Sequence, residues 1–317
     1  MSSTGHPRLL VLRGGALGDF IVTIPVLSAL RRRWPGAHIE LVGYPYLAEI
    51  ASVVGLVDRI ASLHEARIAK FFGLRPHLPD DLRAYIRSFD IVFSYFHDPE
   101  ETVRINLETA GARQVIVGSP LVKELHAVDH FLKPLETLAI YEQGERPTLD
   151  LPASEVNEGC ARLAEYASGA SGPRWILHPG SGNPKKNWPI GHFISLARKL
   201  RDENGIIPLF LLGEADEAAR EGLSRNATDI ARIENLTVRQ VAQLLAAADG
   251  YLGNDSGITH LAAATGARTI ALFGPSNATL WSPRGPHVTL LQAPDNNLDT
   301  LPPPSSTPQF LRKENDV

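Results

Sequence analysis

The feature that most constrains the fold is an alternation of short apolar, β-branched segments with longer helical segments, which restarts once near the middle of the chain. Near-continuous apolar strands are typical of sheets whose two faces are both covered by helices. Strands that alternate with helices favour a doubly wound parallel sheet. The restart therefore predicts an α/β protein with two such sheets facing each other, each binding ligands beyond the carboxyl ends of its strands.

The predicted strands are Arg8–Arg13, His38–Tyr44, Arg59–Leu63, Phe89–Tyr95 and Gln114–Gly118, followed by Arg174–His178, Ile206–Leu212, Asp229–Ile233, Gly250–Gly253 and Thr269–Phe273. The predicted helices are Asp19–Arg33, Tyr46–Val54, Asp80–Ser88, Glu100–Ala110 and His126–Glu142, followed by Ala153–Ala167, Gly191–Asn204, Asp216–Arg225, Val238–Ala248, Gly257–Thr265 and Ala278–Trp281. We expect one domain over residues 1–150 and a second over residues 151–295. Residues 296–317 contain a proline- and serine-rich stretch and are expected to form a flexible tail.

Composition narrows the class of protein. The chain has 317 residues, 44% of them hydrophobic, which fits two globular domains. A net charge of −4 gives no reason to expect a nucleic-acid partner. No run reaches the ~18 apolar residues of a membrane helix, and Leu9 to Leu12 is too short for the core of a signal peptide. The single cysteine, Cys160, excludes an internal disulfide, so we expect a cytoplasmic protein.

Charge is unevenly distributed along the chain. Basic residues are dense between Arg8 and Arg87, whereas the stretch from Asp90 to Glu165 is mostly acidic. Basic clustering attracts anionic surfaces or phosphorylated substrates, and it also arises from ordinary solvated helix faces. Peripheral contact with the inner face of the cytoplasmic membrane therefore stays open.

A glycine-rich turn, from Arg13 to Asp19, joins the first strand to the first helix. Gly15 and Gly18 let the backbone approach a ligand, and the start of the helix presents free N–H groups. The spacing is not that of a dinucleotide-binding G-x-G-x-x-G, and the second strand is not followed by an acid. Asp19 is either a helix cap or a general base that takes a proton from an acceptor hydroxyl.

A second polar segment, from His178 to Pro189, follows the first strand of the second half. Ser181, Gly182 and neighbouring backbone amides are suited to phosphate oxygens. Lys186 is suited to neutralise a diphosphate as a point charge. The alternative is an ordinary loop with surface lysines.

Two further turns follow later strands of the same half. Asp255 and Ser256 precede a helix of small residues that begins at Gly257, where free N–H groups point at an anion. A leaving nucleoside diphosphate is such an anion, and stabilising it there would be electrostatic catalysis. His260 is a phosphate partner or a packing residue. Ser276, after the last predicted strand, is a candidate contact for the donor or part of a plain loop.

Other chemistries lack their motifs in this sequence. No His, Cys and Asp cluster has zinc-ligand spacing. No G-x-S-x-G or Walker A segment occurs. We therefore expect neither a metal nor a cofactor.

These motifs together resemble glycosyltransferase family 9, which includes the bacterial ADP-heptose:lipopolysaccharide heptosyltransferases. The resemblance extends from Arg8 to about Leu291. The motifs that carry it are Gly18-Asp19 followed by Thr23-Ile24-Pro25, His178-Pro179-Gly180 with Lys186-Asn187-Trp188-Pro189, Asn254-Asp255-Ser256-Gly257-Ile258-Thr259-His260, and Leu272-Phe273-Gly274-Pro275.

The resemblance implies a GT-B fold, in which two Rossmann-like domains face a cleft. It also implies inverting, metal-independent transfer from a nucleoside-diphosphate sugar bound by the C-terminal domain to an acceptor bound by the N-terminal domain. By resemblance the catalytic base is Asp19, the donor-phosphate lysine is Lys186, and the hydroxyl ahead of that lysine is Ser181. The phosphate turn falls on Asp255, Ser256, Gly257 and His260, and a basic residue near the acceptor falls on Arg13.

The chain departs from the family pattern in two places. Gly14-Gly15-Ala16 replaces small hydroxyl residues, and Arg239 stands approximately where the family has a glutamate that holds the ribose of the nucleotide. The leading hypothesis is transfer of a sugar, heptose from ADP-heptose, to a lipopolysaccharide-type acceptor. The alternatives are a nucleotide-sugar epimerase of GT-B fold, a non-catalytic sugar-nucleotide-binding protein and, less compatible with the glycine spacing, an NAD-dependent oxidoreductase.

Overall fold

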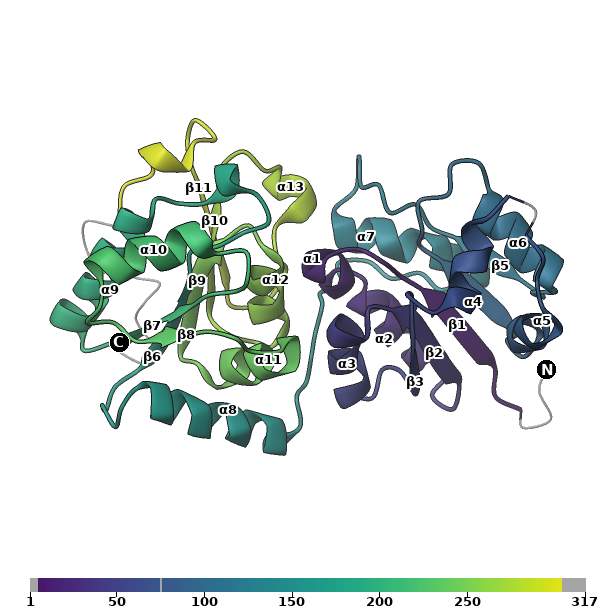
Figure 1. Cartoon of the computed structure of the whole chain (residues 1–317), viewed down its shortest axis with the longest axis horizontal. Coiled ribbons are helices and arrows are strands. Elements are labelled where there is room, and N and C mark those ends of the chain that lie inside the picture. The colour runs from purple at the N-terminus through teal and green to yellow at the C-terminus, as the bar shows by residue number, and fades with distance from the viewer. Residues whose placement is uncertain (1–4, 75, 304–317) are drawn as a thin grey trace. The chain divides into compact units, whose positions relative to one another are not determined.

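A computed structural model describes residues 5–74 and 76–303 of the chain. The chain divides into two compact units, Met1–Pro147 and Thr148–Val317 (Figure 1). Each unit is built around its own parallel sheet with helices on both faces, as the alternation of strands and helices predicts.

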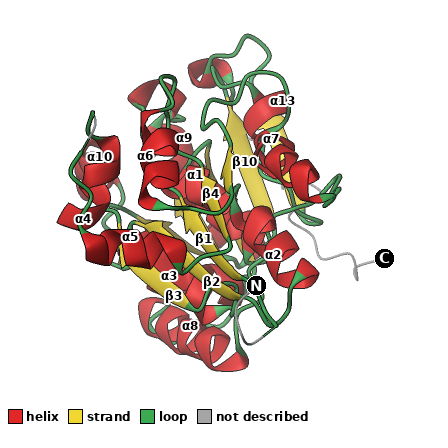
Figure 2. Ribbon diagram, turned by 90° about the vertical axis from the view of Figure 1, so that its right-hand side faces the viewer, coloured by secondary structure: helices red, strands yellow, loops and turns green. Residues whose placement is uncertain are grey.

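The N-terminal unit contains a five-stranded parallel sheet in the order β3-β2-β1-β4-β5. Its strands are β1 (Arg8–Leu12), β2 (His38–Gly43), β3 (Arg59–Ser62), β4 (Ile91–Ser94) and β5 (Val115–Val117). Its helices are α1 (Leu17–Ile21), α2 (Ile24–Arg33), α3 (Pro45–Val53), α4 (Ala66–Ala69), η1 (Lys70–Phe72), α5 (Asp80–Arg87), α6 (Thr102–Ala110), α7 (Ala127–Leu132) and η2 (Lys133–Leu138). Figure 2 shows β1, β2 and β3 side by side among these helices.

Two predicted helices of this unit are interrupted by proline. The segment Asp19–Arg33 forms α1 and α2 with a break at Val22 and Thr23, because the ring of Pro25 would clash with the carbonyl of Ile21 in a continuous helix. The segment His126–Glu142 forms α7 and then the 3₁₀ helix η2, which contains Pro134 and ends at Leu138. The short elements α4 and η1 were not predicted.

The C-terminal unit contains a six-stranded parallel sheet in the order β11-β10-β9-β6-β7-β8. Its strands are β6 (Arg174–His178), β7 (Ile207–Leu211), β8 (Arg232–Ile233), β9 (Gly250–Asn254), β10 (Thr269–Phe273) and β11 (Val288–Gln292). Its helices are α8 (Ala153–Tyr166), η3 (Pro184–Lys186), α9 (Ile190–Asn204), α10 (Glu217–Asn226), α11 (Val238–Ala247), α12 (Gly257–Ala264), α13 (Ala278–Trp281) and η4 (Leu298–Thr300). Strand β11 was not predicted; it is partly exposed and, among the residues that the structure describes, pairs with β10 alone.

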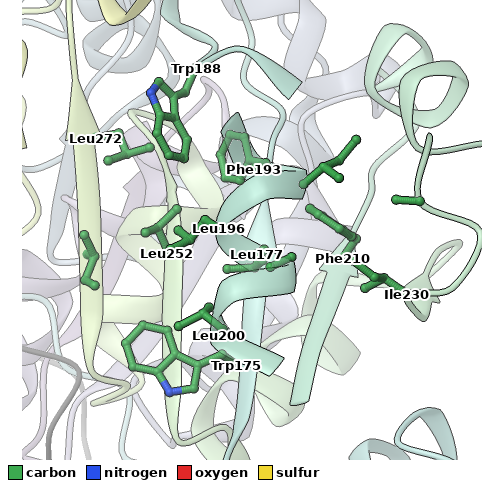
Figure 3. Packing of buried hydrophobic residues seen from close by; sticks show 14 of the residues in the cluster. Trp175, Leu177, Trp188, Phe193, Leu196, Leu200, Phe210, Ile230, Leu252 and Leu272 are labelled. Carbon is green, nitrogen blue, oxygen red and sulfur yellow. The ribbon is translucent and has the colours of Figure 1, made fainter. Parts of the chain in front are cut away.

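One hydrophobic cluster of the C-terminal unit packs α9 against the sheet. Figure 3 shows Phe193 and Leu196 of this helix directed toward the sheet residues Leu177 and Leu252. Burying a side chain of this size contributes about 1.5–3 kcal/mol. This packing fixes the strand ends from which the polar loops emerge.

Packing in this unit also includes the start of the predicted tail. Leu298 is 2% exposed within the same core, and Trp188 Nε1–H donates a hydrogen bond to the carbonyl of Leu301 at 2.7 Å. The prediction of a flexible tail is therefore wrong for residues 296–301, because Leu298 adds apolar surface that the core buries. The part of the predicted tail over residues 304–317 lies outside the described residues.

Candidate active site

Each sheet has one point at which the order of its strands reverses. In the N-terminal sheet this point lies between β1 and β4, and in the C-terminal sheet it lies between β6 and β9. Open α/β sheets bind ligands beyond the carboxyl ends of the strands at such a switch point. The predicted site residues Arg13 to Asp19 follow β1. Ser181, Gly182 and Lys186 follow β6, and Asp255 to His260 follow β9.

The glycine turn after β1 places Asp19 in the first turn of α1. Gly15 has φ +103°, a conformation that side chains rarely adopt, and a Cβ there would lie 2.9 Å from Asp19 Oδ2. The Asp19 Oδ2 atom accepts a hydrogen bond from the Ala16 N–H at 3.0 Å. Asp19 is therefore a helix cap, yet its side chain remains 32% exposed and its other oxygen keeps lone pairs available.

Arg13 is buried behind this turn and is only 4% exposed. Its Nη2 donates to the carbonyl of Asp19 at 3.0 Å and lies 3.6 Å from Asp19 Oδ1. Its Nε donates to Thr23 Oγ1 at 3.0 Å, and its guanidinium lies 4.4 Å from the centre of the Phe131 ring. Burial lowers the pKa of Arg13 while Asp19 raises it, and the guanidinium stays cationic.

No role was predicted from the sequence for Thr23 and Phe131, which contact Arg13, or for Ser94 at the end of β4. Thr23 Oγ1 both accepts from Arg13 and donates to the Asp19 carbonyl at 2.8 Å. Phe131 comes from α7, far along the chain. Ser94, at the end of β4, is 1% exposed, and within the described residues its hydroxyl has no hydrogen-bond partner. Thr23 belongs to the family motif Thr23-Ile24-Pro25, but its hydrogen bonds to Arg13 and Asp19 were not predicted.

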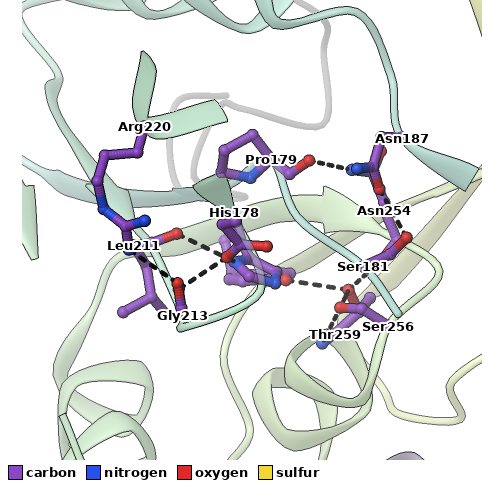
Figure 4. A network of polar contacts seen from close by, with 12 residues as sticks. His178, Pro179, Ser181, Asn187, Leu211, Gly213, Arg220, Asn254, Ser256 and Thr259 are labelled. Atoms are coloured by element: carbon purple, nitrogen blue, oxygen red, sulfur yellow. Dashed lines mark hydrogen bonds and ion pairs between the residues drawn. The ribbon is translucent and has the colours of Figure 1, made fainter. Parts of the chain in front are cut away.

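Asn254 joins the two loops at the switch point of the C-terminal sheet (Figure 4). Its Nδ2 donates to the carbonyl of Pro179 at 2.8 Å, and its Oδ1 accepts from the Trp188 N–H at 2.9 Å. Asn254 is fully buried. An amide that both donates and accepts is required here, because it fixes the loop after β6 against the end of β9.

The predicted phosphate lysine and the predicted helix start lie next to each other in this arrangement. Lys186 Nζ forms an ion pair with Asp255 Oδ2 at 2.7 Å. The Lys186 side chain is 35% exposed, whereas that of Asp255 is 9% exposed. Asp255 therefore holds the ammonium group of Lys186 at the edge of the sheet, although the two residues are 69 positions apart.

The start of α12 presents backbone donors beside this ion pair. The N–H groups of Ser256, Gly257 and Ile258 form no hydrogen bond within the described part of the chain, and all three residues are partly exposed. Ser256 Oγ accepts from the Thr259 N–H at 3.4 Å, a long capping bond. His260 is 5% exposed. Consecutive free amides at a helix start form an anion-binding site.

The loop after β6 is held partly by its own polar side chains. Ser181 Oγ lies 2.7 Å from the Asn183 carbonyl and 2.6 Å from Asn187 Oδ1, and it accepts from the Asn183 N–H at 3.2 Å. A hydroxyl has one proton, so the Ser181 O–H donates its one hydrogen bond within this loop. Gly182 has open space around it, since a Cβ there would meet no atom within 4 Å.

A second buried acid, Asp216, supports the start of the same loop. A Cβ on Gly180 would lie 1.8 Å from Asp216 Oδ1, so only glycine fits there. Asp216 Oδ2 accepts from the Gly213 N–H at 2.7 Å and lies 3.8 Å from His178 Nδ1. Burial lowers the pKa of His178 against the opposing effect of Asp216. The sequence had suggested only a helix start for Asp216.

Ser276 follows β10 at the same edge of the C-terminal sheet. Its Oγ is buried, and no hydrogen-bond partner for it occurs among residues 5–74 and 76–303. A buried hydroxyl without a partner costs free energy, about 1–3 kcal/mol. The Ser276 hydroxyl is therefore an available hydrogen-bond donor for a polar ligand atom.

Arg239 is engaged with another helix. Its Nε and Nη2 contact the carboxylate of Glu155 on α8 at 2.8 and 2.5 Å, and Gln243 Nε2 donates to the same carboxylate at 2.7 Å. The Arg239 hydrogen bonds lower the pKa of Glu155 to about 2. Arg239 therefore ties α11 to α8.

No group of three His, Cys, Asp or Glu side chains among the described residues is arranged to hold a metal ion. None of the helices that the structure describes is long and apolar enough to cross a membrane.

Comparison with known proteins identifies relatives along most of the chain. The model of glycosyltransferase family 9 (heptosyltransferase) matches residues 121–307. Lipopolysaccharide heptosyltransferase 2 of Escherichia coli is 26% identical over 303 residues, which cover 87% of this chain and 85% of that protein. Lipopolysaccharide heptosyltransferase 1 of Pseudomonas aeruginosa is 26% identical over 294 residues, covering 85% and 79%.

Solved structures share the fold. A family 9 glycosyltransferase from Veillonella parvula has a TM-score of 0.74 at 21% identity, covering 91% of this chain and 86% of that one. ADP-heptose lipopolysaccharide heptosyltransferase II of E. coli also scores 0.74, at 20% identity, covering 93% and 95%. The predicted GT-B class with two Rossmann-like domains is confirmed. The chain belongs to glycosyltransferase family 9, the heptosyltransferase family, and is a glycosyltransferase.

Proposed function

We propose that this enzyme transfers heptose from ADP-heptose to a hydroxyl group of a lipopolysaccharide-type acceptor, with inversion and without a metal ion. The observation that carries the proposal is the juxtaposition of Lys186 with the free amides of Ser256 and Gly257 at the switch point of the C-terminal sheet. The relatives named lipopolysaccharide heptosyltransferases support the choice of heptose and acceptor. A solved E. coli heptosyltransferase described with ADP, which has a TM-score of 0.68, supports the choice of nucleotide.

The C-terminal unit, over residues 151–295, binds the donor in this proposal. The diphosphate accepts hydrogen bonds from the free amides at the start of α12 and lies against the Lys186 ammonium. Gly182 lets the loop after β6 approach the phosphates, and the Ser276 hydroxyl and His260 contact the donor. Ser181 contributes by fixing that loop, because its one proton is already bonded within it. Asp255 is an anion, so its contribution is to position Lys186 rather than to touch the phosphates.

The N-terminal unit, over residues 1–150, binds the acceptor. Gly15 and Gly18 let the acceptor approach the turn after β1, and Arg13 fixes the turn through the Asp19 carbonyl. The Asp19 carboxylate takes the proton of the acceptor hydroxyl as its oxygen attacks the anomeric carbon. The bond from that carbon to the diphosphate breaks, and its electron pair leaves with the nucleoside diphosphate. Lys186 and the α12 amides stabilise the charge that develops on this leaving group.

The proposal is tested by a panel of nucleoside diphosphates and their sugars, followed by a transfer assay. A ligand present at about 100 times its Kd stabilises the folded protein by about 2.7 kcal/mol. We expect ADP and ADP-heptose to raise the melting temperature more than UDP or GDP compounds do. We also expect ADP-heptose to be consumed only when acceptor is present, with inverted product.

Three outcomes would overturn the proposal. A preference for another nucleotide sugar would refute the donor. Conversion of the donor without acceptor would indicate an epimerase. Donor binding with no transfer to any lipopolysaccharide core would indicate a non-catalytic binding protein.

A further inference from the structure

A chain of hydroxyl groups lies beneath the start of α12. Tyr251 Oη lies 3.0 Å from Thr259 Oγ1. Ser256 Oγ lies 3.2 Å from the same atom, and the Thr259 hydroxyl also donates to the backbone carbonyl of Asn254 (Figure 4). Tyr251 and Thr259 are fully buried, whereas Ser256 is partly exposed. The chain of hydroxyls therefore leads from the interior of the C-terminal unit to the free amides of the proposed donor site.

Strand β9 carries the Tyr251 hydroxyl to its own carboxyl end. Residues two apart in a strand point to the same face, so Tyr251 and Gly253 share one face of β9. A Cβ on Gly253 would overlap the Tyr251 hydroxyl, so the glycine leaves room for the ring to reach along the strand toward α12. Burial raises the pKa of Tyr251. The hydroxyl therefore keeps its proton and acts as a donor.

The direction of each hydrogen bond in this chain follows from the number of protons. A backbone carbonyl only accepts, so the single proton of Thr259 goes to Asn254. Thr259 Oγ1 is therefore the acceptor in its other two contacts, and its two lone pairs take the protons of Tyr251 and Ser256. In this arrangement the Ser256 proton points at Thr259, and Ser256 Oγ accepts from the Thr259 N–H at 3.4 Å.

We propose that Tyr251 is a positioning residue that releases the Ser256 hydroxyl for the donor diphosphate. The inference rests on the proposed function, in which the diphosphate binds at the start of α12. When the Ser256 O–H turns to a phosphate oxygen, Thr259 Oγ1 loses one of its two donors and Tyr251 remains as the other. Without the Tyr251 hydroxyl, this buried oxygen would be left without a donor, which destabilises the bound state. Tyr251 therefore lowers the free energy needed to turn Ser256 toward the donor.

The test compares Tyr251→Phe with the parent protein by isothermal titration of ADP. Phenylalanine keeps the ring and its packing and removes only the hydroxyl. One hydrogen bond changes an affinity by about three- to tenfold, so the Kd for ADP should rise by that factor. A contact made equally in the ground state and the transition state changes KM alone, so the KM for the donor should rise similarly while kcat is unchanged.

Two further variants show whether the effect passes through Ser256. Ser256→Ala removes the hydroxyl that Tyr251 releases, so adding Tyr251→Phe in that background should not raise the Kd further. The matched control is Tyr95→Phe in the N-terminal unit, because Tyr95 is also buried and its hydroxyl donates to the Phe131 carbonyl at 3.0 Å. This control should lose stability to a similar extent and leave the Kd for ADP unchanged.

The outcomes separate the inference from the proposed function. An unchanged Kd in Tyr251→Phe, or an equal rise when residue 256 is already alanine, would overturn the inference alone. An equal loss of affinity in Tyr95→Phe would also overturn it, because the loss would then reflect stability. No binding of ADP or of any other nucleoside diphosphate to the parent protein would refute the proposed function and the inference together.

Discussion

Replacing Lys186 by alanine should change both stability and donor affinity, because the lysine pairs with Asp255 and, in our proposal, binds the donor diphosphate. In the folded protein Lys186 Nζ lies 2.7 Å from Asp255 Oδ2. The variant removes a cation that we propose binds the donor diphosphate. It also leaves a carboxylate that is 9% exposed without its partner. Stability and donor affinity should therefore both fall, for different reasons.

The stability effect follows from the exposure of the two side chains. Breaking a fully buried pair costs about 3–5 kcal/mol, and breaking an exposed pair about 0–1 kcal/mol. Lys186 is 35% exposed and Asp255 is 9% exposed, so the pair lies between these limits. We expect Lys186→Ala to lower the free energy of unfolding by about 1–2 kcal/mol, or the melting temperature by about 3–6 °C.

A double-mutant cycle with Asp255→Asn isolates the binding effect. In Lys186→Ala/Asp255→Asn the orphaned charge is gone, so the melting temperature should return close to that of Asp255→Asn alone. Affinity for a nucleoside diphosphate should not return, because a charge-assisted contact of about 1.5–3 kcal/mol is still missing. Isothermal titration should show a Kd raised about 10- to 100-fold in both variants that lack the lysine.

Two results would refute this reasoning. Unchanged nucleoside diphosphate affinity in Lys186→Ala would mean that the lysine does not contact the donor. Recovery of affinity in the double variant would mean that the loss came from the unpaired Asp255. Asp255→Asn alone is the control, since it keeps the lysine and should bind the donor within several-fold of the parent protein.

Three further substitutions test particular contacts. Glu155→Gln should lower the free energy of unfolding by about 1–2 kcal/mol at neutral pH, a discounted value because Arg239 is 39% exposed. The folded-state pKa of about 2 lies below the ordinary 4.5, so in urea titrations this difference should persist above pH 4.5 and shrink as the pH falls toward 2. Gly180→Ala should destabilise the protein by about 1–3 kcal/mol, and Asp216→Ala in the same chain should relieve much of that loss; equal loss in both backgrounds would exclude the clash. Arg13→Lys should destabilise the protein by about 1–3 kcal/mol because lysine cannot bond Thr23 and Asp19 as the guanidinium does; unchanged thermal stability would argue against that network.

The strands could be predicted from the sequence because parallel strands buried on both faces are apolar throughout. Arg174–His178 and Thr269–Phe273 are found with the predicted bounds. Edge strand β11 is half exposed and lacks that signature. The break in Asp19–Arg33 has a visible cause in Pro25. The burial of Leu298 has no visible cause in the sequence, because it depends on packing against core residues that are distant along the chain.

The candidate site could be located from the sequence where residue chemistry and local spacing coincide, and its roles stay predictions. An anion site is indicated by the local sequence in two places, the turn at Asp255 and Ser256 and the loop of Lys186. What the sequence does not indicate is their pairing, since the Lys186–Asp255 and Asn254–Pro179 contacts depend on β6 lying beside β9. Asp216 was missed for the same reason, because its contact with Gly180 joins two different strand ends.

The measurement that most directly tests the proposed mechanism is the turnover of Asp19→Asn, compared with its donor affinity. Asparagine can still accept the Ala16 N–H, so the cap and the melting temperature should be kept. Loss of a general base typically costs ~10²–10⁴-fold in rate. We predict a fall of that size in transfer to the acceptor, with nucleoside diphosphate affinity unchanged. Turnover close to that of the parent protein would contradict the assignment of Asp19 as the base.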